Sequence, residues 1–198
     1  MNPTHTAHQL PSRAAVVGAG AWGTTFASLL AEAGAPTTVW ARRQEVAAEI
    51  NSGTNTRYAP SLSLPPEVRA TTDMRAAVAG AGIVVVALPS QLARGAIEPL
   101  AGAVEPGALV VSLMKGIELG TRMRMSEVLA QVLGVPGERV AVVSGPNLAD
   151  EIAVRQPTAT VVASSSQDTA AAVAAACATA TFRPYTNNDV LGVELCGA

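Results

Sequence analysis

The sequence predicts an α/β fold with a Rossmann-like, doubly wound and mostly parallel sheet. Short apolar runs alternate with stretches of helical periodicity along the whole chain. Hydrophobic residues make up 49% of the 198 residues, and aromatic residues only 3%. This composition is typical of proteins whose buried parallel strands use Val and Ile and whose closely packed helices use Ala. A glycine-rich turn also joins the first apolar run to the first helical stretch.

Each predicted strand is a short, mainly apolar run between polar or glycine residues. The run at 83–88 is the strongest, and the run at 68–71 is the weakest. The predicted strands cover residues 14–17, 37–40, 68–71, 83–88, 109–112, 140–144, 160–163 and 182–185. Because helices alternate with these strands, we expect a parallel sheet with right-handed crossovers and helices on both faces.

The predicted helices have apolar residues at helical spacing, and Gly34 follows the first of them as a terminating glycine. These helices cover residues 22–33, 44–52, 74–78, 91–100, 123–133 and 167–178. The polar, proline-rich stretch 55–66 predicts a long loop that contacts a cofactor or acts as a lid. From residue 188 the pattern turns helical again. We therefore expect a disordered tail at 1–13, a Rossmann domain at 14–187 and the start of a helical second domain at 188–198.

The composition also excludes several classes of function. The net charge is −2 with a pI near 5.7, and the basic residues are scattered, which argues against a nucleic-acid partner. Cys177 and Cys196 lack the spacing of a metal site or a disulfide framework, so we interpret them as two small core residues. No apolar run approaches the ~20 residues that a membrane span needs. The polar N-terminus does not resemble a secretory signal, so we expect a cytoplasmic protein.

Three glycines between the first strand and the first helix have the GxGxxG spacing of a dinucleotide-binding turn. Gly18 would allow the tight turn, Gly20 the approach of a pyrophosphate, and Gly23 close packing of the helix on the strand. The helix N-terminus would then face the anion. The alternative is a plain strand-to-helix turn. Trp22 could stack on a cofactor, whereas we expect Phe26, one turn later, in the core.

Two adjacent arginines, Arg42 and Arg43, follow the second predicted strand. NAD sites carry an acidic residue in this region for the adenosine ribose. Guanidinium groups instead suit a 2′-phosphate, which they bind through charge-assisted hydrogen bonds. The sequence therefore favours NADP over NAD as the cofactor, and use of both stays open. The alternative is a pair of solvated surface arginines.

Polar turns follow three of the predicted strands. They are Leu88-Pro89-Ser90-Gln91, Leu113-Met114-Lys115-Gly116 and Ser144-Gly145-Pro146-Asn147. Ligands of doubly wound sheets bind beyond the carboxyl ends of the strands, where these turns meet. A lysine after a strand is by itself more often a surface residue. Three polar turns on one rim nevertheless indicate a substrate site that includes Lys115.

Several segments of the chain occur together in one known family. In chain order they are Gly18-Ala19-Gly20-Ala21-Trp22-Gly23-Thr24, Asn55-x-x-Tyr58-x-Pro60, Lys115-Gly116, Ser144-Gly145-Pro146-Asn147-Leu148-Ala149-x-Glu151, Pro157-Thr158 and Gly192-Val193-Glu194-Leu195-Cys196-Gly197-Ala198. On these segments the sequence resembles the NAD(P)-dependent glycerol-3-phosphate dehydrogenases over nearly all of residues 14–198. The glycine turn occurs in many dehydrogenases, whereas the Lys-Gly, Ser-Gly-Pro and final segments together are highly specific.

The resemblance implies a role for individual residues. Ala21 and Trp22 would contact the cofactor pyrophosphate region, and Lys115 would touch both cofactor and substrate. The other implied contacts are Arg42, Arg43, Tyr58 and Ala149 with the cofactor, and Gly145 and Asn147 with the substrate. Ala59 and Leu148 depart from the Leu and Phe that are usual in the family, which we interpret as packing changes. No metal is implied.

The resemblance also implies an activity for a longer protein. It would reduce dihydroxyacetone phosphate reversibly to sn-glycerol 3-phosphate with NAD(P)H, for glycerophospholipid synthesis, and a homodimer stays open. The proton-donating lysine of the family would follow Ala198, in a helical substrate domain that this chain lacks, so we expect the chain itself to bind cofactor only. Two alternatives are another NADP-dependent reductase of a small keto or hydroxy acid and a non-catalytic NAD(P)-binding module.

Overall fold

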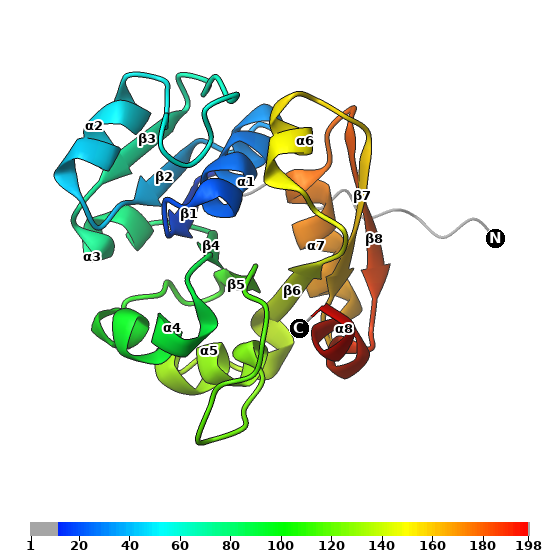
Figure 1. Ribbon diagram of the computed structural model, residues 1–198. Helices are drawn as coiled ribbons and strands as arrows, with labels where there is room; N and C mark the ends of the chain where they lie inside the picture. Colours follow the sequence, from blue (N-terminus) through cyan, green and yellow to red (C-terminus); the bar gives the residue numbers. More distant parts are fainter. Residues whose placement is uncertain (1–11, 198) are drawn as a thin grey trace.

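Eight strands form one sheet in the computed structural model, which describes residues 12–197 (Figure 1). Their order across the sheet is β3-β2-β1-β4-β5-β6-β7-β8. The strands are β1 Ala14–Val17, β2 Thr37–Trp40, β3 Val68–Thr71, β4 Ile83–Val86, β5 Leu109–Ser112, β6 Val140–Ser144, β7 Thr158–Ala163 and β8 Phe182–Asn187. The order of the first six is that of doubly wound dinucleotide-binding domains, and the predicted fold class is confirmed.

The chain reverses its direction of travel across the sheet between β1 and β4. It runs from β1 outward to β2 and β3, then returns to place β4 on the other side of β1. Both neighbours of β1 pair with it in parallel, with Val17 opposite Trp40 on one side and Val86 on the other. The crevice beyond the carboxyl ends of strands at such a reversal is where ligands bind in this class of fold.

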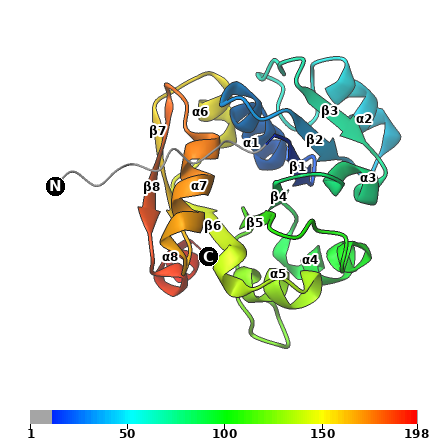
Figure 2. The ribbon, with the colours of Figure 1, turned by 180° about the vertical axis from the view of Figure 1, so that it is seen from behind.

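Helices cover both faces of the sheet (Figures 1 and 2). They are α1 Ala21–Glu32, α2 Gln44–Asn51, α3 Met74–Val78, α4 Ser90–Ile97, α5 Met125–Leu133, α6 Ala149–Ala153, α7 Gln167–Cys177 and α8 Val190–Gly197, with short 3₁₀ turns at Glu98–Leu100 and Gly137–Arg139. Alternate residues of β1 face opposite sides of the sheet and belong to two different hydrophobic cores. Ala14 and Val16 belong to the core under α1, α2 and α7, whereas Ala15 and Val17 belong to the core under α4 and α5. Strands buried on both faces explain why the sequence shows continuous apolar runs.

The sheet departs from an entirely parallel arrangement at one pair of strands. β6 and β7 are antiparallel, with Val143 opposite Val162, and β8 then pairs in parallel with β7. The sequence predicted a mostly parallel sheet, and this pair is the exception, which the strand–helix alternation did not locate. The connection between β6 and β7 contains only α6, a five-residue helix that contacts α1. Since α6 does not cross the length of the sheet, the chain re-enters from the edge at which it left.

Other differences from the sequence expectations are local. The sequence reasoning missed α6, and Cys196 is exposed rather than in the core, while Cys177 is buried as expected. Arg13, which we assigned to the disordered tail, donates hydrogen bonds to Ala79 O at 2.8 Å and Thr38 Oγ1 at 3.1 Å. The rest of that tail, residues 1–11, and Ala198 lie outside the described residues. Within residues 12–197, no helix is long and apolar enough to cross a membrane.

The first helix packs very closely on the strands beneath it. Gly18 has a φ of +122°, which favours glycine, and a Cβ there would overlap the carbonyl oxygen of Ala87. A Cβ at Gly23 would overlap the carbonyl oxygen of Gly18 and lie 3.0 Å from Ala87 Cβ. Phe26 is fully buried as expected, with its ring edge-on to Trp22 at 5.4 Å between centroids. These two glycines therefore set how close α1 comes to the sheet.

The close packing gives a first prediction. Replacing Gly23 by Ala forces a methyl group against fixed backbone, so we expect the free energy of unfolding to fall by about 1–3 kcal/mol. Gly95→Ala is the matched control, because Gly95 is inside α4 and its Cβ would meet no atom within 4 Å. That change should raise the stability by about 0.5–1 kcal/mol. Urea unfolding of both variants checks the pair, and a Gly23→Ala variant as stable as the unaltered protein would contradict the packing argument.

Candidate functional site

Three adjoining cavities form a groove along the carboxyl ends of the central strands. The arginine cavity has a volume of about 330 Å³ and contains Gly18, Gly20, Arg42, Arg43 and Tyr58 among its lining residues. The middle cavity, of about 470 Å³, is lined by Gly20, Trp22, Gly23, Lys115 and parts of the turns after β4 and β5. The α8 cavity, of about 400 Å³, is lined by Lys115, Ser144, Gly145, Pro146, Val161, Val193, Cys196 and Gly197.

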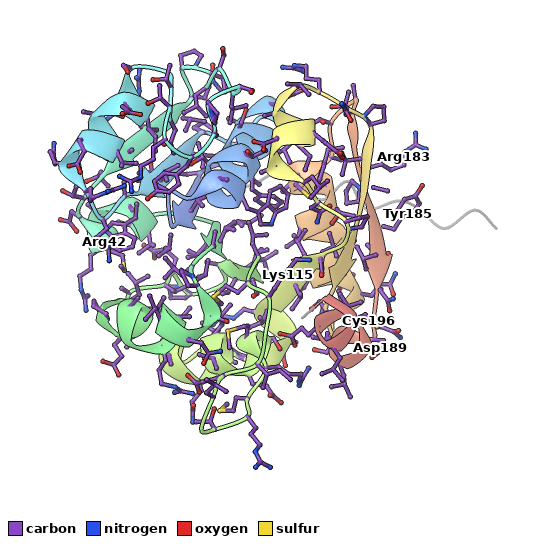
Figure 3. The ribbon with its side chains drawn as sticks, viewed as in Figure 1. Arg42, Lys115, Arg183, Tyr185, Asp189 and Cys196 are labelled. Carbon is purple, nitrogen blue, oxygen red and sulfur yellow. The ribbon has the colours of Figure 1, made fainter. Side chains whose placement is uncertain are left out.

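The cavities are continuous through shared residues. Gly20 lines both the arginine and the middle cavity, and Lys115 lines both the middle and the α8 cavity. The labelled side chains of Arg42, Lys115 and Cys196 mark the course of the groove in Figure 3. The three polar turns that the sequence predicted to meet on one rim do meet there. Ala21, Asn147 and Ala149 are not among the lining residues, although the resemblance implied contacts for them.

The N-terminus of α1 opens into the groove with its backbone donors uncapped. Gly20 is the N-cap residue, so no side chain bonds to the first turn, and that turn contains no acidic residue. The first N–H groups of a helix have no partner within the helix and carry the positive end of its dipole. A Cβ at Gly20 would meet no atom of residues 12–197 within 4 Å. The open backbone at this point fits the pyrophosphate of a dinucleotide.

The two arginines differ in their surroundings. Arg43 donates a hydrogen bond to the Tyr58 hydroxyl at 2.8 Å, and its guanidinium carbon lies 5.8 Å from the centroid of that ring. Arg43 Nε also lies 3.5 Å from a carboxylate oxygen of Glu45. Arg42 is exposed on the wall of the same cavity. Arg43 is therefore held in place by its neighbours, and Arg42 is the arginine with its charge turned to solvent.

Asn55 fastens the long loop to the glycine turn. Its Nδ2 donates to Ala19 O at 3.1 Å and to Thr24 Oγ1 at 2.8 Å. Asn55 is buried, and its Oδ1 has no hydrogen-bond partner among the described residues. Asn55 belongs to a segment shared with the family, but its place in the sequence did not indicate this role. Its contacts explain how Tyr58, three residues later, reaches Arg43.

Lys115 is exposed in the groove, between the turn that follows β6 and the start of α1. Its Nζ donates to the carbonyl oxygen of Gly145 at 3.4 Å. The two residues before it, Leu113 and Met114, are buried and hold the backbone against the sheet. The structure thus brings together Lys115 and Gly145, which the resemblance placed at the substrate. Asn147 turns away from them and donates to Thr160 Oγ1 at 2.9 Å.

Helix α4 holds the loop that follows Lys115. The carboxamide of Gln91 donates to Ile117 O at 2.8 Å and accepts from Leu119 N at 2.9 Å, the pattern that a neighbouring parallel strand would provide. Arg94, three residues later on the same helix face, pairs with both carboxylate oxygens of Glu118 at 2.9–3.1 Å. The hydrogen bonds from Arg94 and then Thr121 hold the pKa of the Glu118 carboxyl below its ordinary value. No sequence pattern predicted the contacts of Gln91 and Arg94 with this loop, which join residues 24 to 28 positions apart.

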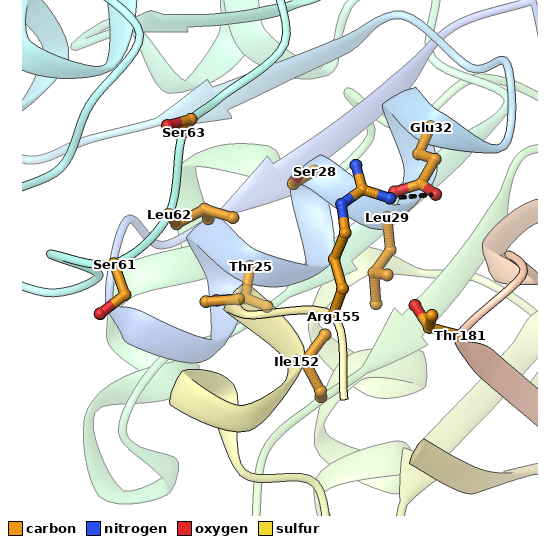
Figure 4. A pocket seen from close by; sticks show the side chains of 11 residues that line it. Thr25, Ser28, Leu29, Glu32, Ser61, Leu62, Ser63, Ile152, Arg155 and Thr181 are labelled. Atoms are coloured by element: carbon orange, nitrogen blue, oxygen red, sulfur yellow. Dashed lines mark hydrogen bonds and ion pairs between the residues drawn. The ribbon is translucent and has the colours of Figure 1, made fainter. Parts of the chain in front are cut away.

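A separate polar cavity of about 260 Å³ lies between α1, the loop at 61–63 and α6 (Figure 4). Hydroxyl groups line it, and Arg155 Nη1 pairs with Glu32 Oε1 at 3.0 Å on its rim. It contains none of the residues that the sequence marked as functional. Because its arginine is already paired with a carboxylate, it offers no unmatched charge to a ligand.

Known proteins with a similar sequence share one activity in their names. Residues 13–170 match a family model described as NAD-dependent glycerol-3-phosphate dehydrogenase N-terminus. The chain is 55% identical to glycerol-3-phosphate dehydrogenase (NAD(P)+) of Frankia casuarinae over 94% of this chain and 56% of that protein. It is 53% identical to the protein of the same name from Streptomyces griseus, over 95% of this chain and 56% of the relative.

Among solved structures, glycerol-3-phosphate dehydrogenase from Coxiella burnetii superposes with a TM-score of 0.85. Its sequence is 33% identical, and the match covers 93% of this chain and 56% of that chain. This chain therefore spans about 56% of the length of the curated relatives that it matches.

The pair of Arg94 and Glu118 gives a second prediction. Because the folded protein lowers the pKa of Glu118, its stabilisation is complete above the ordinary carboxyl pKa of about 4.3 and is lost as the pH falls through the lowered value. Glu118→Gln should therefore be less stable at pH 7 and should lose less stability on acidification to about pH 3 than the unaltered chain. Glu67→Gln, at an exposed position outside this loop, should keep the original pH dependence. Equal pH dependence for both variants in denaturant titrations would contradict the role of the pair.

Proposed function

This chain belongs to the NAD-dependent glycerol-3-phosphate dehydrogenase family, of which it matches the N-terminal domain, and we therefore propose that its groove binds NADP or NAD next to a three-carbon phosphate substrate. The longer protein would interconvert dihydroxyacetone phosphate and sn-glycerol 3-phosphate. One observation carries the proposal. A single groove runs from the arginine pair, past an uncapped helix N-terminus, to the only lysine of the sequence.

The proposal places the cofactor from the arginine cavity into the middle cavity. The pyrophosphate would lie at the first turn of α1, near Gly18, Gly20, Ala21 and Trp22, where backbone N–H groups and the helix dipole favour an anion. The adenosine end would lie between Arg42, Arg43 and Tyr58. Ala149 and Asn147 retain their proposed contacts only if the loop after β6 moves towards the groove.

NADP is the preferred cofactor under this proposal because of Arg42. Its exposed guanidinium can turn to a 2′-phosphate and bind it in a bidentate geometry. Arg43 is already bonded to Tyr58. It would hold the Tyr58 ring against the adenosine rather than bind the 2′-phosphate. The names of the relatives give NAD(P)+ without a preference.

The substrate end of the proposal centres on Lys115. When bound, the nicotinamide supplies the hydride that reduces the carbonyl carbon. The Lys115 ammonium, fixed by Gly145 O, would place positive charge beside the developing alkoxide and the phosphate. The family resemblance puts the proton-donating lysine after Ala198, in the second domain that we propose to begin near residue 188. Turnover is therefore proposed for the longer protein.

A third prediction separates the two arginines. Arg42→Ala should weaken NADPH binding by about 1.5–3 kcal/mol, the range for a hydrogen bond to a charged group, and leave NADH binding nearly unchanged. Arg43→Ala should weaken both cofactors, because Tyr58 loses its partner. Arg75→Ala, on α3 away from the groove, is the control and should change neither. Fluorescence titration of each cofactor measures the effects. Equal losses for NADPH and NADH in Arg42→Ala would show that Arg42 does not read the 2′-phosphate.

A fourth prediction concerns turnover. The 198-residue chain should bind NADPH without measurable reduction of dihydroxyacetone phosphate, and a protein extended through the second domain should reduce it. In that protein Lys115→Met should lower kcat/KM by about 10²–10⁴, as expected for loss of a positioned charged group. NADPH absorbance follows the reaction. Turnover by the 198-residue chain alone would show that the proton donor is among its own residues.

The same assay separates the alternatives. Reduction of a small keto acid, but not of dihydroxyacetone phosphate, by the extended protein would favour another NADP-dependent reductase. Cofactor binding without turnover of any carbonyl substrate would favour a binding module.

A further inference from the structure

The last helix buries its charged residue and exposes its leucines. In α8 the Glu194 residue is only 9% exposed, whereas Leu191 is 53% and Leu195 50% exposed. Asp189 begins the helix, where its Oδ1 accepts from Gly192 N at 2.8 Å. Burying a carboxylate costs free energy unless it is fully hydrogen-bonded. The contacts of Glu194 must therefore offset the cost of burying its carboxylate while two leucines stay exposed.

Glu194 is bonded to the beginning of α5. Its Oε1 accepts from Ser126 N at 2.9 Å, and its Oε2 accepts from Ser126 Oγ at 2.6 Å and from Arg124 Nη1 at 3.1 Å. The Ser126 N–H is in the first turn of α5, where backbone donors lack a partner within the helix and the dipole favours an anion. The carboxylate thus accepts hydrogen bonds from three donors, which would otherwise need water molecules as partners.

The contact between Glu194 and Arg124 joins α8 to the end of the loop that follows Lys115. Arg124 ends the loop that begins after Lys115, and α8 contributes Val193, Cys196 and Gly197 to the wall of the cavity that Lys115 also lines. Gly197 packs directly on the Ser144 side chain, because a Cβ there would overlap Ser144 Oγ. Helix α8 is therefore held against α5 by Glu194 and against β6 by Gly197, with the cavity between it and Lys115.

A buried ion pair often stabilises no more than an apolar residue of similar size would, whereas its directional bonds define one orientation. A leucine at position 194 could pack on α5 in several rotations of α8. A carboxylate with three fixed donors admits only the rotation that turns Cys196 and Gly197 to the cavity. The geometry therefore favours orientation over stability as the role of Glu194.

We propose that Glu194 is a positioning residue whose carboxylate, held by Arg124 and Ser126, fixes α8 as the wall of the substrate cavity opposite Lys115. The inference deepens the proposed function, on which it rests only for the identity of the ligand in that cavity.

The chain offers two unique reporters on this cavity. Lys115 is the only lysine of the sequence, and Cys196 is the exposed one of its two cysteines (Figure 3). Cys177 is buried, and burial raises the pKa of its thiol to about 12, so it stays unreactive near neutral pH. A short amine-to-thiol cross-linker should join Lys115 to Cys196 in the unaltered chain, and mass spectrometry distinguishes this product from one with the N-terminal amine.

Glu194→Gln tests the proposal with almost no change in size. We expect most of the Lys115–Cys196 cross-link to be lost and the alkylation rate of Cys196 by iodoacetamide to rise. Glu127→Gln is the matched control, since Glu127 also pairs with Arg124, at 2.7 Å, but has no hydrogen bond or ion pair with α8 among the described residues. It should keep the cross-link. Ser126→Ala removes one donor of the Glu194 carboxylate and leaves the backbone N–H, and should give an intermediate yield.

NADPH affinity shows whether loss of the cross-link reflects a local change at α8 or a change in the whole fold. If Glu194 only stabilised the fold, Glu194→Gln would lower NADPH affinity and the melting temperature together with the cross-link. Under the proposal, NADPH affinity stays within about twofold of the unaltered chain, because no residue of α8 lines either cavity proposed to hold the cofactor, the arginine cavity or the middle cavity. Full cross-linking in Glu194→Gln, or equal losses in Glu194→Gln and Glu127→Gln, overturns the inference. The cross-link needs no cofactor, so absence of NADPH binding in the unaltered chain would count against the proposed function alone.

Discussion

The close approach of α1 to the sheet is the constraint on which the groove depends. Gly18 and Gly23 have no side chains, so the helix begins directly above the carboxyl ends of β1 and β4. At that height its first N–H groups open into the groove instead of into protein. A Cβ at either position would overlap a backbone carbonyl oxygen, so α1 could not lie this close to the sheet. The same short turn thus meets a packing requirement and forms the proposed anion site.

Lys115 shows how a loop residue acquires a fixed place. Its backbone leaves a buried strand, and the following residues have little apolar surface of their own in the core. Helix α4 holds them through Gln91 and the pair of Arg94 and Glu118, and α8 holds the end of the loop through Glu194. The loop is therefore positioned by polar contacts with two helices that are distant in sequence. Such contacts are directional, which suits the role proposed for Lys115, whose charge would lie beside the reacting group.

The comparisons and the geometry support different parts of the conclusion. The family match covers residues 13–170, and so includes the arginine pair, Lys115 and the turn after β6, but not α8. The groove extends beyond that match to α8, where Glu194, Cys196 and Gly197 form its last wall. More than two fifths of the length of the relatives lies outside this chain, so cofactor, substrate and turnover are proposals, whereas the doubly wound fold and the groove are features of the structure itself.

The sequence by itself determined the strands, the helices other than α6 and the glycine turn. The four-residue apolar run at 14–17 has the bounds expected, because a strand buried on both faces must be continuously apolar wherever it lies in the fold. Gly18 and Gly23 could be assigned from spacing alone, since their roles are set by neighbours within a few residues. The tertiary structure decided the antiparallel direction of β7, the exposure of Cys196 and the burial of Glu194. It also decided that Arg43 is bonded to Tyr58 while Arg42 is not, and that Gln91 holds the lysine loop. These features depend on partners 15 to 70 residues away, and no local pattern of hydrophobicity or spacing encodes which donor will meet which acceptor across that distance.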